Sequence, residues 1–317
     1  MDIDPILAGV LKEVNAPGFT PMHEVSPDRA RGAYRRMTAG TRAAAQALPV
    51  DGTDQSITSP SGTLLLRTHR PRDTEPGATC VYLHGGGYVI GDLDTHEAIA
   101  RTIAHEMNVV VVAVDYRLAP EHPFPAAHED SRLALEWAWR ERSELGGSDH
   151  LLLAGDSAGA ALCLSLSTSS GEVPVLAQLL LCPYLDLVPM TASRQRFAQG
   201  HLLEEATLTW FADSYSGMAS VDEVASDPRV RPPTEAALGR APTSLVAVAG
   251  FDPLHDEGVE LASRLVAAGV RADLMELPDM IHGFPDFAGS SPRAAEALND
   301  VVRAFDALTK EMVSRGE

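Results

Sequence analysis

The stretch "LLLAGDSAGAAL" at residues 151–162 runs three leucines into Gly-Asp-Ser-Ala-Gly and then returns at once to small apolar residues. Leucines suit the interior of a sheet and alanines favour a helix, so Ser157 lies at a junction between a strand and a helix. Gly155 and Gly159 allow chain segments to approach closely around a sharp turn. A G-x-S-x-G pattern at such a junction exposes the serine hydroxyl, which makes Ser157 a candidate nucleophile.

Strand-like and helix-like segments alternate on both sides of this turn. The strand patterns occur at 54–60, 62–71, 78–84, 108–117, 150–155, 175–183, 244–252 and 272–279. The first two are expected to form an antiparallel hairpin, and helical patterns separate most of the others. Buried strands that alternate with helices predict a mostly parallel sheet with helices on both faces. We therefore expect an α/β fold with a central sheet of about eight strands.

Two helix-forming stretches interrupt this alternation. Residues 1–50 precede the first strand, and residues 187–225 separate two strands by more chain than one crossover needs. Helices inserted over the carboxyl edge of a sheet would form a cap above the ligand site. We expect a helical cap from these two stretches and a catalytic domain from 51–186 and 226–317. The alternative is that the extra helices pack elsewhere on the surface.

Composition limits the partners of the chain. Its 317 residues are 45% hydrophobic, and 25 Lys and Arg face 44 Asp and Glu, which gives a net charge of −19. Such a charge repels nucleic acids and anionic lipid surfaces. No apolar run is long enough for a membrane-spanning helix, so no membrane insertion is expected. Three cysteines in apolar surroundings and the absence of a secretory signal pattern predict buried free thiols and a cytoplasmic protein.

A serine hydroxyl needs a base to remove its proton, and the base needs a partner to orient it. Two later strands supply both groups. The strand at 244–252 ends at Asp252, and the strand that ends near Leu277 is followed by a short loop to His282. The carboxyl ends of parallel strands meet at one edge of a sheet. We therefore expect Ser157, Asp252 and His282 to meet there as nucleophile, orienting acid and base.

Other acids and histidines compete for these roles. Asp256 and Glu257 follow Asp252 closely, but acids at these positions are typical of a helix start. Asp279 lies in the loop before the candidate base, where it is better suited to shaping the turn. His255 is the main rival base, but it adjoins the candidate acid and would strain to reach the serine.

Acyl transfer also requires donors aimed at the oxygen that becomes negative in the tetrahedral intermediate. The glycine-rich segment "YLHGGGYVIG" at residues 82–91 can direct two backbone N–H groups at one point. The N–H of Ala158, next to the nucleophile, would be the third donor. The segment lacks the spacing of a phosphate-binding loop. His84 is interpreted as a brace for this loop.

Five motifs in this order resemble the hormone-sensitive-lipase-like family of α/β-hydrolase carboxylesterases. They are "HGGGY" at 84–88, "DYRLAPEHPFPA" at 115–126, "GDSAG" at 155–159, "DPLHDEG" at 252–258 and "HGF" at 282–284. The resemblance implies an α/β-hydrolase fold with a helical cap. Many relatives continue the serine motif with glycine where this chain has Ala160, a change of one methyl group that leaves the catalytic assignment unaffected.

The resemblance also implies roles for particular residues. It assigns the nucleophile, base and acid to Ser157, His282 and Asp252, the oxyanion hole to Gly86, Gly87 and Ala158, and support of that loop to His84 and Gly85. Members of this family hydrolyse short- to medium-chain acyl esters through an acyl-enzyme. They need no cofactor or metal, and they often form homodimers. We therefore expect a small-molecule ester as substrate and a homodimer.

Two alternatives use the same scaffold. One is an amidase or N-deacetylase with the same three residues, and the other is a receptor-like binding protein, of the kind that has lost the base. The segment at 115–126 is interpreted as scaffold, with a pair formed by Asp115 and Arg117. Acyl and alcohol preference would depend on side chains of the cap. The candidates are Met22, Phe197, Leu202, Trp210, Phe211 and Tyr215, each of which ordinary core packing explains equally well.

Overall fold

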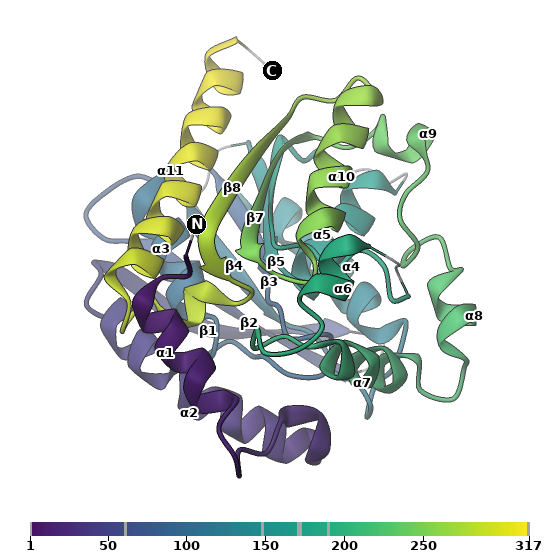
Figure 1. Ribbon diagram of the computed structural model, residues 1–317. Coiled ribbons are helices and arrows are strands. Elements are labelled where there is room, and N and C mark those ends of the chain that lie inside the picture. Colours follow the sequence, from purple (N-terminus) through teal and green to yellow (C-terminus); the bar gives the residue numbers. More distant parts are fainter. Residues whose placement is uncertain (1, 60–61, 147–148, 170–172, 189–190, 316–317) are drawn as a thin grey trace.

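The structure is a computed structural model that describes residues 2–59, 62–146, 149–169, 173–188 and 191–315 (Figure 1). Parts of the segments discussed above therefore lie outside the described residues. These parts are residues 1, 60–61, 147–148, 170–172, 189–190 and 316–317.

One eight-stranded sheet forms the centre of the molecule, in the order β1-β2-β4-β3-β5-β6-β7-β8. The strands are β1 (Val50–Ser59), β2 (Gly62–Pro71), β3 (Thr79–Leu83), β4 (Val110–Asp115), β5 (Leu151–Asp156), β6 (Ala177–Leu181), β7 (Thr243–Phe251) and β8 (Ala272–Ile281). Pairs β1/β2 and β2/β4 are antiparallel, and all other neighbours are parallel. The expected hairpin and the mostly parallel sheet are both confirmed.

The central strands are mostly apolar because helices cover both of their faces. On one face lie α3 (Glu97–Met107) and α11 (Pro292–Arg315), and on the other lie α4 (Ala126–Glu141), α5 (Ala158–Thr168) and α10 (His255–Ala267). Helix α1 (Pro5–Val14) buries Leu7 and Leu11 in the same core as α3 and α11. Figure 1 shows α3 and α11 on one side of the strands, with α5 and α10 on the other. Successive residues of a strand point to opposite faces, so neighbours such as Tyr82 and Leu83 enter two separate cores.

Further helices come from the two stretches that interrupt the alternation, from the chain before β7 and from the chain after β8. They are η1 (Met22–Glu24), α2 (Pro27–Ala45), α6 (Ala192–Arg196), α7 (Glu205–Ser216), α8 (Val221–Ala225), α9 (Glu235–Leu238) and η2 (Phe284–Phe287). The long helices α2 and α7 lie in the segments that the sequence predicts to be helical. The short helices contain too few residues to show a helical periodicity in the sequence. A hydrogen bond of 3.0 Å between His23 Nδ1 and Thr207 Oγ1 joins η1 to α7.

The last strand differs from the expectation. We expected β8 to end near Leu277 and a short loop to lead to His282, but the strand continues to Ile281. It does so because the pairing with β7 resumes at Phe251 and Ile281 after an irregularity in the register. His282 therefore follows the strand directly. Across the described ranges, the helices lack the combination of length and apolar character that a membrane span requires.

Candidate active site

Ser157 occupies the turn between β5 and α5, where it caps the first turn of the helix. Its backbone has φ of 51°, a left-handed conformation that is rare for a residue with a side chain. The turn is tight because Gly159 packs against the carbonyl of Leu83, and a β-carbon at residue 159 would overlap that oxygen. The side chain of Ser157 remains in reach of a pocket although the residue is only 8% exposed.

The structure brings the three expected side chains together at one edge of the sheet. His282 Nε2 lies 3.1 Å from Ser157 Oγ, and His282 Nδ1 lies 2.7 Å from Asp252 Oδ2. The other oxygen of Asp252 accepts the backbone N–H of Leu254 at 2.7 Å, and the residue is fully buried. These contacts fix both the position of the carboxylate and the plane of the imidazole ring.

The Asp252 carboxylate also sets the protonation of His282. Burial by itself lowers the pKa of an imidazole, but here the negative charge and the hydrogen bond of Asp252 outweigh it. The net result is a pKa for His282 above the ordinary 6.5. A raised pKa makes the ring a stronger base toward the serine hydroxyl.

The rival residues point elsewhere. His255 lies 3.1 Å from Asp256 and 3.5 Å from Glu276, at the start of α10. Asp279 lies within β8, where its carboxylate pairs with Arg293 at 2.8 Å. Glu257 belongs to the first turn of α10, as expected, and is buried against Arg194 at 3.3 Å.

The glycine-rich segment forms a loop beside the serine. Gly86 and Gly87 have φ of 109° and 59°, and the carbonyl of Gly86 accepts the N–H groups of Val89 and Ile90. Among the described residues, the N–H groups of Gly86, Gly87 and Ala158 have no recorded acceptor. Unpaired amide donors around a serine hydroxyl are what an oxyanion requires.

A buried hydrogen-bond network that the sequence did not reveal holds this loop. Asp156 Oδ1 accepts the N–H of Gly85 at 3.0 Å and the hydroxyl of Tyr82, while Oδ2 lies 3.4 Å from His96 Nε2. Burial by itself raises the pKa of Asp156, but His96 and Tyr82 outweigh it and lower the pKa. The carboxylate next to the nucleophile therefore ties the loop to β5. The G-x-S-x-G pattern leaves its second position open, so the pattern alone does not indicate a role for Asp156.

His84 lies below the same loop. Its ring stacks on Tyr116 with 4.2 Å between the centroids, and its Nδ1 lies 2.7 Å from the carbonyl of Gly85. Burial lowers the pKa of His84 to about 4, so the ring is neutral at physiological pH. These contacts describe a side chain packed under the loop.

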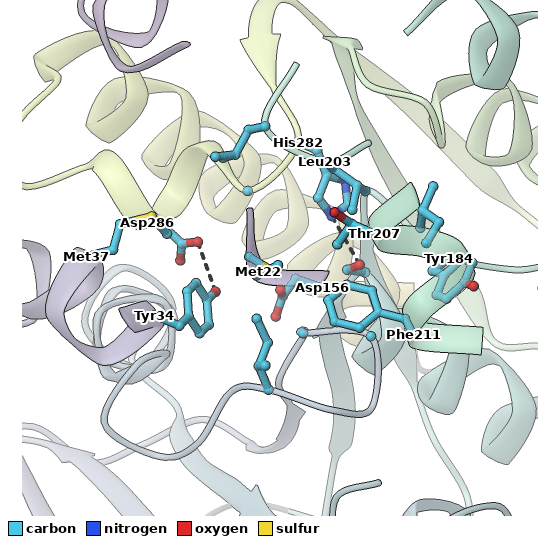
Figure 2. A pocket seen from close by; sticks show the side chains of 17 residues that line it. Met22, Tyr34, Met37, Asp156, Tyr184, Leu203, Thr207, Phe211, His282 and Asp286 are labelled. Atoms are coloured by element: carbon cyan, nitrogen blue, oxygen red, sulfur yellow. Dashed lines mark hydrogen bonds between the residues drawn. The ribbon is translucent and has the colours of Figure 1, made fainter. Parts of the chain in front are cut away.

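A pocket leads to Ser157 and His282 (Figure 2). Three of the cap residues that we expected at this pocket line it: Met22, Leu202 and Phe211. Phe197, Trp210 and Tyr215 do not line it. Tyr215 stacks on Tyr88, and Phe197 packs against Phe251 and His201. Several further residues that line the pocket were not predicted from the sequence, namely Tyr34, Met37, Ile90, Tyr184, Leu203, Thr207, Leu208 and Asp286.

All three cysteines are buried and free, as expected. Cys182 lies next to the acid and the base, with its thiol and one ligand atom each of Asp252 and His282 within 4.8 Å of one another. Burial raises the pKa of the Cys182 thiol well above its usual range, and Asp252 raises it further. A thiol held in its protonated form is a poor metal ligand, because metal binding requires the thiolate.

The segment at 115–126 differs from the expectation in its ion pair. Arg117 does not pair with Asp115. Its guanidinium binds Asp130 at 2.8 Å and Glu129 at 3.2 Å, both on α4. Burial raises the pKa of Asp115 to about 6, with a further contribution from Asp92.

Comparisons with known proteins agree with this geometry. The profile of a family with the α/β hydrolase fold matches residues 80–286. Ethyl acetate hydrolase from Pseudomonas putida is 35% identical in an alignment of length 318 that covers 96% of this chain and 99% of that protein. Carboxylic ester hydrolase LipN from Mycobacterium tuberculosis is 38% identical over 281 residues, which cover 84% of this chain and 74% of that one.

A solved structure extends the likeness to the whole fold. The hyperthermophilic esterase from Pyrobaculum calidifontis superposes with a TM-score of 0.87 at 31% identity, covering 97% of this chain and 99% of that chain. The fold and the match of residues 80–286 agree with the resemblance seen in the five motifs. This chain belongs to the hormone-sensitive-lipase-like family of α/β hydrolases, and the relatives named above are carboxylic ester hydrolases and esterases.

Proposed function

We propose that the protein is a serine carboxylesterase that hydrolyses short- to medium-chain acyl esters through an acyl-enzyme. One observation carries the proposal: His282 bridges Ser157 and Asp252 through its two ring nitrogens, at 3.1 and 2.7 Å. This arrangement supplies a nucleophile, a base and an orienting acid, each within hydrogen-bonding distance of the next. The names of the relatives point to the same reaction class.

Acylation begins when His282 Nε2 takes the proton of Ser157 Oγ as the oxygen bonds to the ester carbonyl carbon. The carbonyl oxygen becomes negative and accepts hydrogen bonds from the backbone N–H groups of Gly86, Gly87 and Ala158. Asp252 accepts a hydrogen bond from the Nδ1–H group of His282 and stabilises the imidazolium. The tetrahedral intermediate then collapses, and His282 gives its proton to the departing alcohol oxygen.

Deacylation repeats these steps with water. His282 takes a proton from the water molecule, whose oxygen attacks the acyl carbon, and Ser157 leaves as the protonated alcohol. Nothing in this cycle is oxidised or reduced, so the chemistry asks for no cofactor.

The helices of 1–50 and 187–225 are proposed to act as a cap, apart from the undescribed residues 1 and 189–190. Met22 and Met37 from the first stretch and Leu208 from the second line the same pocket as Ser157. An apolar wall of this kind suits a short hydrocarbon chain. These side chains and Ser157 line one pocket, which supports the proposed preference for short to medium acyl groups.

The decisive experiment compares p-nitrophenyl acetate with p-nitroacetanilide, which offer the same acyl group as an ester and as an amide. Faster turnover of the ester is expected, together with labelling of Ser157 by a fluorophosphonate probe. Faster turnover of the amide would favour the amidase reading. Failure of both substrates and of the probe would favour the receptor-like binding protein. A series of p-nitrophenyl esters of increasing acyl length then tests the chain-length preference.

The homodimer and the cytoplasmic location stay predictions from the sequence and the family. Sedimentation velocity of the purified protein tests the first, because a dimer has twice the mass of the chain. Fractionation of cells that express the protein from its own gene tests the second.

A further inference from the structure

One wall of the active-site pocket carries a carboxylate among apolar side chains. Figure 2 shows Asp286 and Tyr34 beside Met37, across the pocket from Phe211 and Tyr184. Asp286 belongs to η2, which follows the strand that leads to the catalytic histidine, and Tyr34 belongs to α2. The two residues are 252 positions apart in the chain.

The carboxylate of Asp286 is buried but incompletely paired. The residue is 8% exposed, and its Oδ2 accepts the hydroxyl of Tyr34 at 2.9 Å. Among the described residues no donor to Oδ1 is recorded, although that oxygen belongs to a side chain that lines the pocket. A carboxylate can accept about four hydrogen bonds, and leaving it unpaired away from water costs free energy. Oδ1 is therefore available to a donor that enters the pocket.

The second carboxylate at this pocket, that of Asp156, behaves differently. Its two oxygens are engaged by the N–H of Gly85, the hydroxyl of Tyr82 and the ring of His96. These contacts hold the glycine-rich loop, so Asp156 has its partners within the protein. Asp286 contacts neither this loop nor the serine by any recorded hydrogen bond of the described residues. Its side-chain hydrogen bond with Tyr34 orients the carboxylate.

The charges around Asp286 favour a donor of neutral or positive charge. Burial raises the pKa of this carboxyl to about 6, while His96 and Tyr34 oppose that shift. The group is therefore mostly ionised at neutral pH, and an ionised acceptor forms stronger hydrogen bonds than a neutral one. The carboxylate of Asp156 also lines this pocket, so a negatively charged substituent would be repelled.

We propose that Asp286 is a specificity determinant that accepts a hydrogen bond from a hydroxyl or ammonium group on the substrate. The inference rests on the proposed esterase function and names its substrate class: short esters with a donor on the arm that lies along Tyr34 and Met37. The apolar wall holds the carbon chain, and the carboxylate selects the polar end. Tyr34 acts as a positioning residue for that carboxylate.

The test uses pairs of esters of equal length. In each pair the reference ester ends in a methyl group, and the other ester ends in a hydroxymethyl or an aminomethyl group. One series varies the acyl arm and the other varies the alcohol arm, because either arm can lie on this wall. In the wild-type protein we expect kcat/KM to be about tenfold or more higher for the donor-bearing ester in one series. That factor corresponds to one hydrogen bond to a charged group.

Variants at residue 286 then test whether Asp286 causes this preference. Asp286→Leu removes the acceptor, so the preference should vanish, whereas Asp286→Asn retains an oxygen acceptor and should keep part of it. Thermal unfolding reports whether each variant folds. The comparison of esters in the wild-type protein tests the inference even if a variant does not fold. Equal kcat/KM within every wild-type pair, or the same preference in a folded Asp286→Leu variant, would overturn the inference. If the inference fails but the methyl-ended esters are hydrolysed, the proposed esterase function still holds. If none of the esters is hydrolysed, the proposed esterase function itself is overturned.

Discussion

The ring of Phe211 on α7 packs directly against the backbone of Gly87 in the glycine-rich loop, so closely that a β-carbon at residue 87 would overlap the ring. Gly87 also has φ of 59°, which L-residues with side chains seldom adopt. A helix from the stretch 187–225 thus sets the position of a proposed oxyanion donor.

Gly87→Ala is therefore expected to push the loop or α7 out of place. We predict a fall in kcat/KM of about 10²-fold, the usual effect of losing one oxyanion donor. Steady-state kinetics on p-nitrophenyl acetate measures it. The double variant Gly87→Ala/Phe211→Ala restores space for the methyl group and should recover part of the loss. A single variant with wild-type kinetics would show that this contact does not position the donor.

Asp252→Asn should lower kcat by about 10⁴-fold, because an amide cannot hold His282 in the tautomer that accepts the serine proton. Asp279→Asn is the matched control: it removes a carboxylate from the neighbouring strand that pairs with Arg293 instead. The control should retain near-normal turnover. If the two variants exchanged these phenotypes, the acid would have been assigned to the wrong residue.

The pH profile of kcat/KM reports the base of the free enzyme. His282 must be neutral to accept a proton, and its pKa lies above the ordinary 6.5. Activity should therefore fall as the pH drops through a midpoint above 6.5. Asp252→Asn removes the charge that opposes the effect of burial, so the midpoint of its residual activity should move to lower pH. A wild-type midpoint under 6.5, or a variant with an unchanged midpoint, would contradict this assignment.

The buried pair of Arg194 and Glu257 is expected to matter for stability. Both side chains are about 5% exposed or less and lie 3.3 Å apart. Arg194→Met removes the cation that offsets the burial of Glu257, which should cost about 3 kcal/mol of unfolding free energy. The double variant Arg194→Met/Glu257→Gln should recover much of that loss. Chemical denaturation at neutral pH checks both expectations, and equal stability of wild type and Arg194→Met would refute them.

The same pair predicts how the stability of the fold changes with pH. Burial raises the pKa of Glu257 to about 7 from the ordinary 4.5, although Arg194 opposes the shift. Because the folded state then holds its proton more tightly than the unfolded state, this group stabilises the fold at low pH. That contribution is lost as the pH rises from 4.5 to about 7. Glu257→Gln should remove this part of the pH dependence, which unfolding curves across the range will show.

The positions of Ser157, Asp252 and His282 could be predicted because each follows a recognisable strand. In a parallel sheet the ends of β5, β7 and β8 meet at one edge, so the order of elements brings distant residues together. The glycine-rich loop could be predicted for the same reason, since it follows β3. Local pattern and topology were sufficient for these features.

The contacts that support the site could not be predicted in this way. The pairing of Tyr34 with Asp286 depends on how α2 packs against η2. The sequence pattern around each residue does not indicate which residue lies opposite it. The partner of Arg117 lies on α4 rather than beside it in the chain, which no spacing rule indicates. The extension of β8 to Ile281 follows from resumed pairing with β7, a property of two strands together.

The central claim is that Ser157 carries the acyl group, and trapping the acyl-enzyme tests it most directly. The protein is mixed rapidly with excess p-nitrophenyl acetate, quenched in acid, digested and analysed by mass spectrometry. We predict a burst of p-nitrophenol and one acetyl group on Ser157, with neither in Ser157→Ala. Turnover of the ester by wild type with the acetyl group on another residue, or undiminished turnover by Ser157→Ala, would contradict the account.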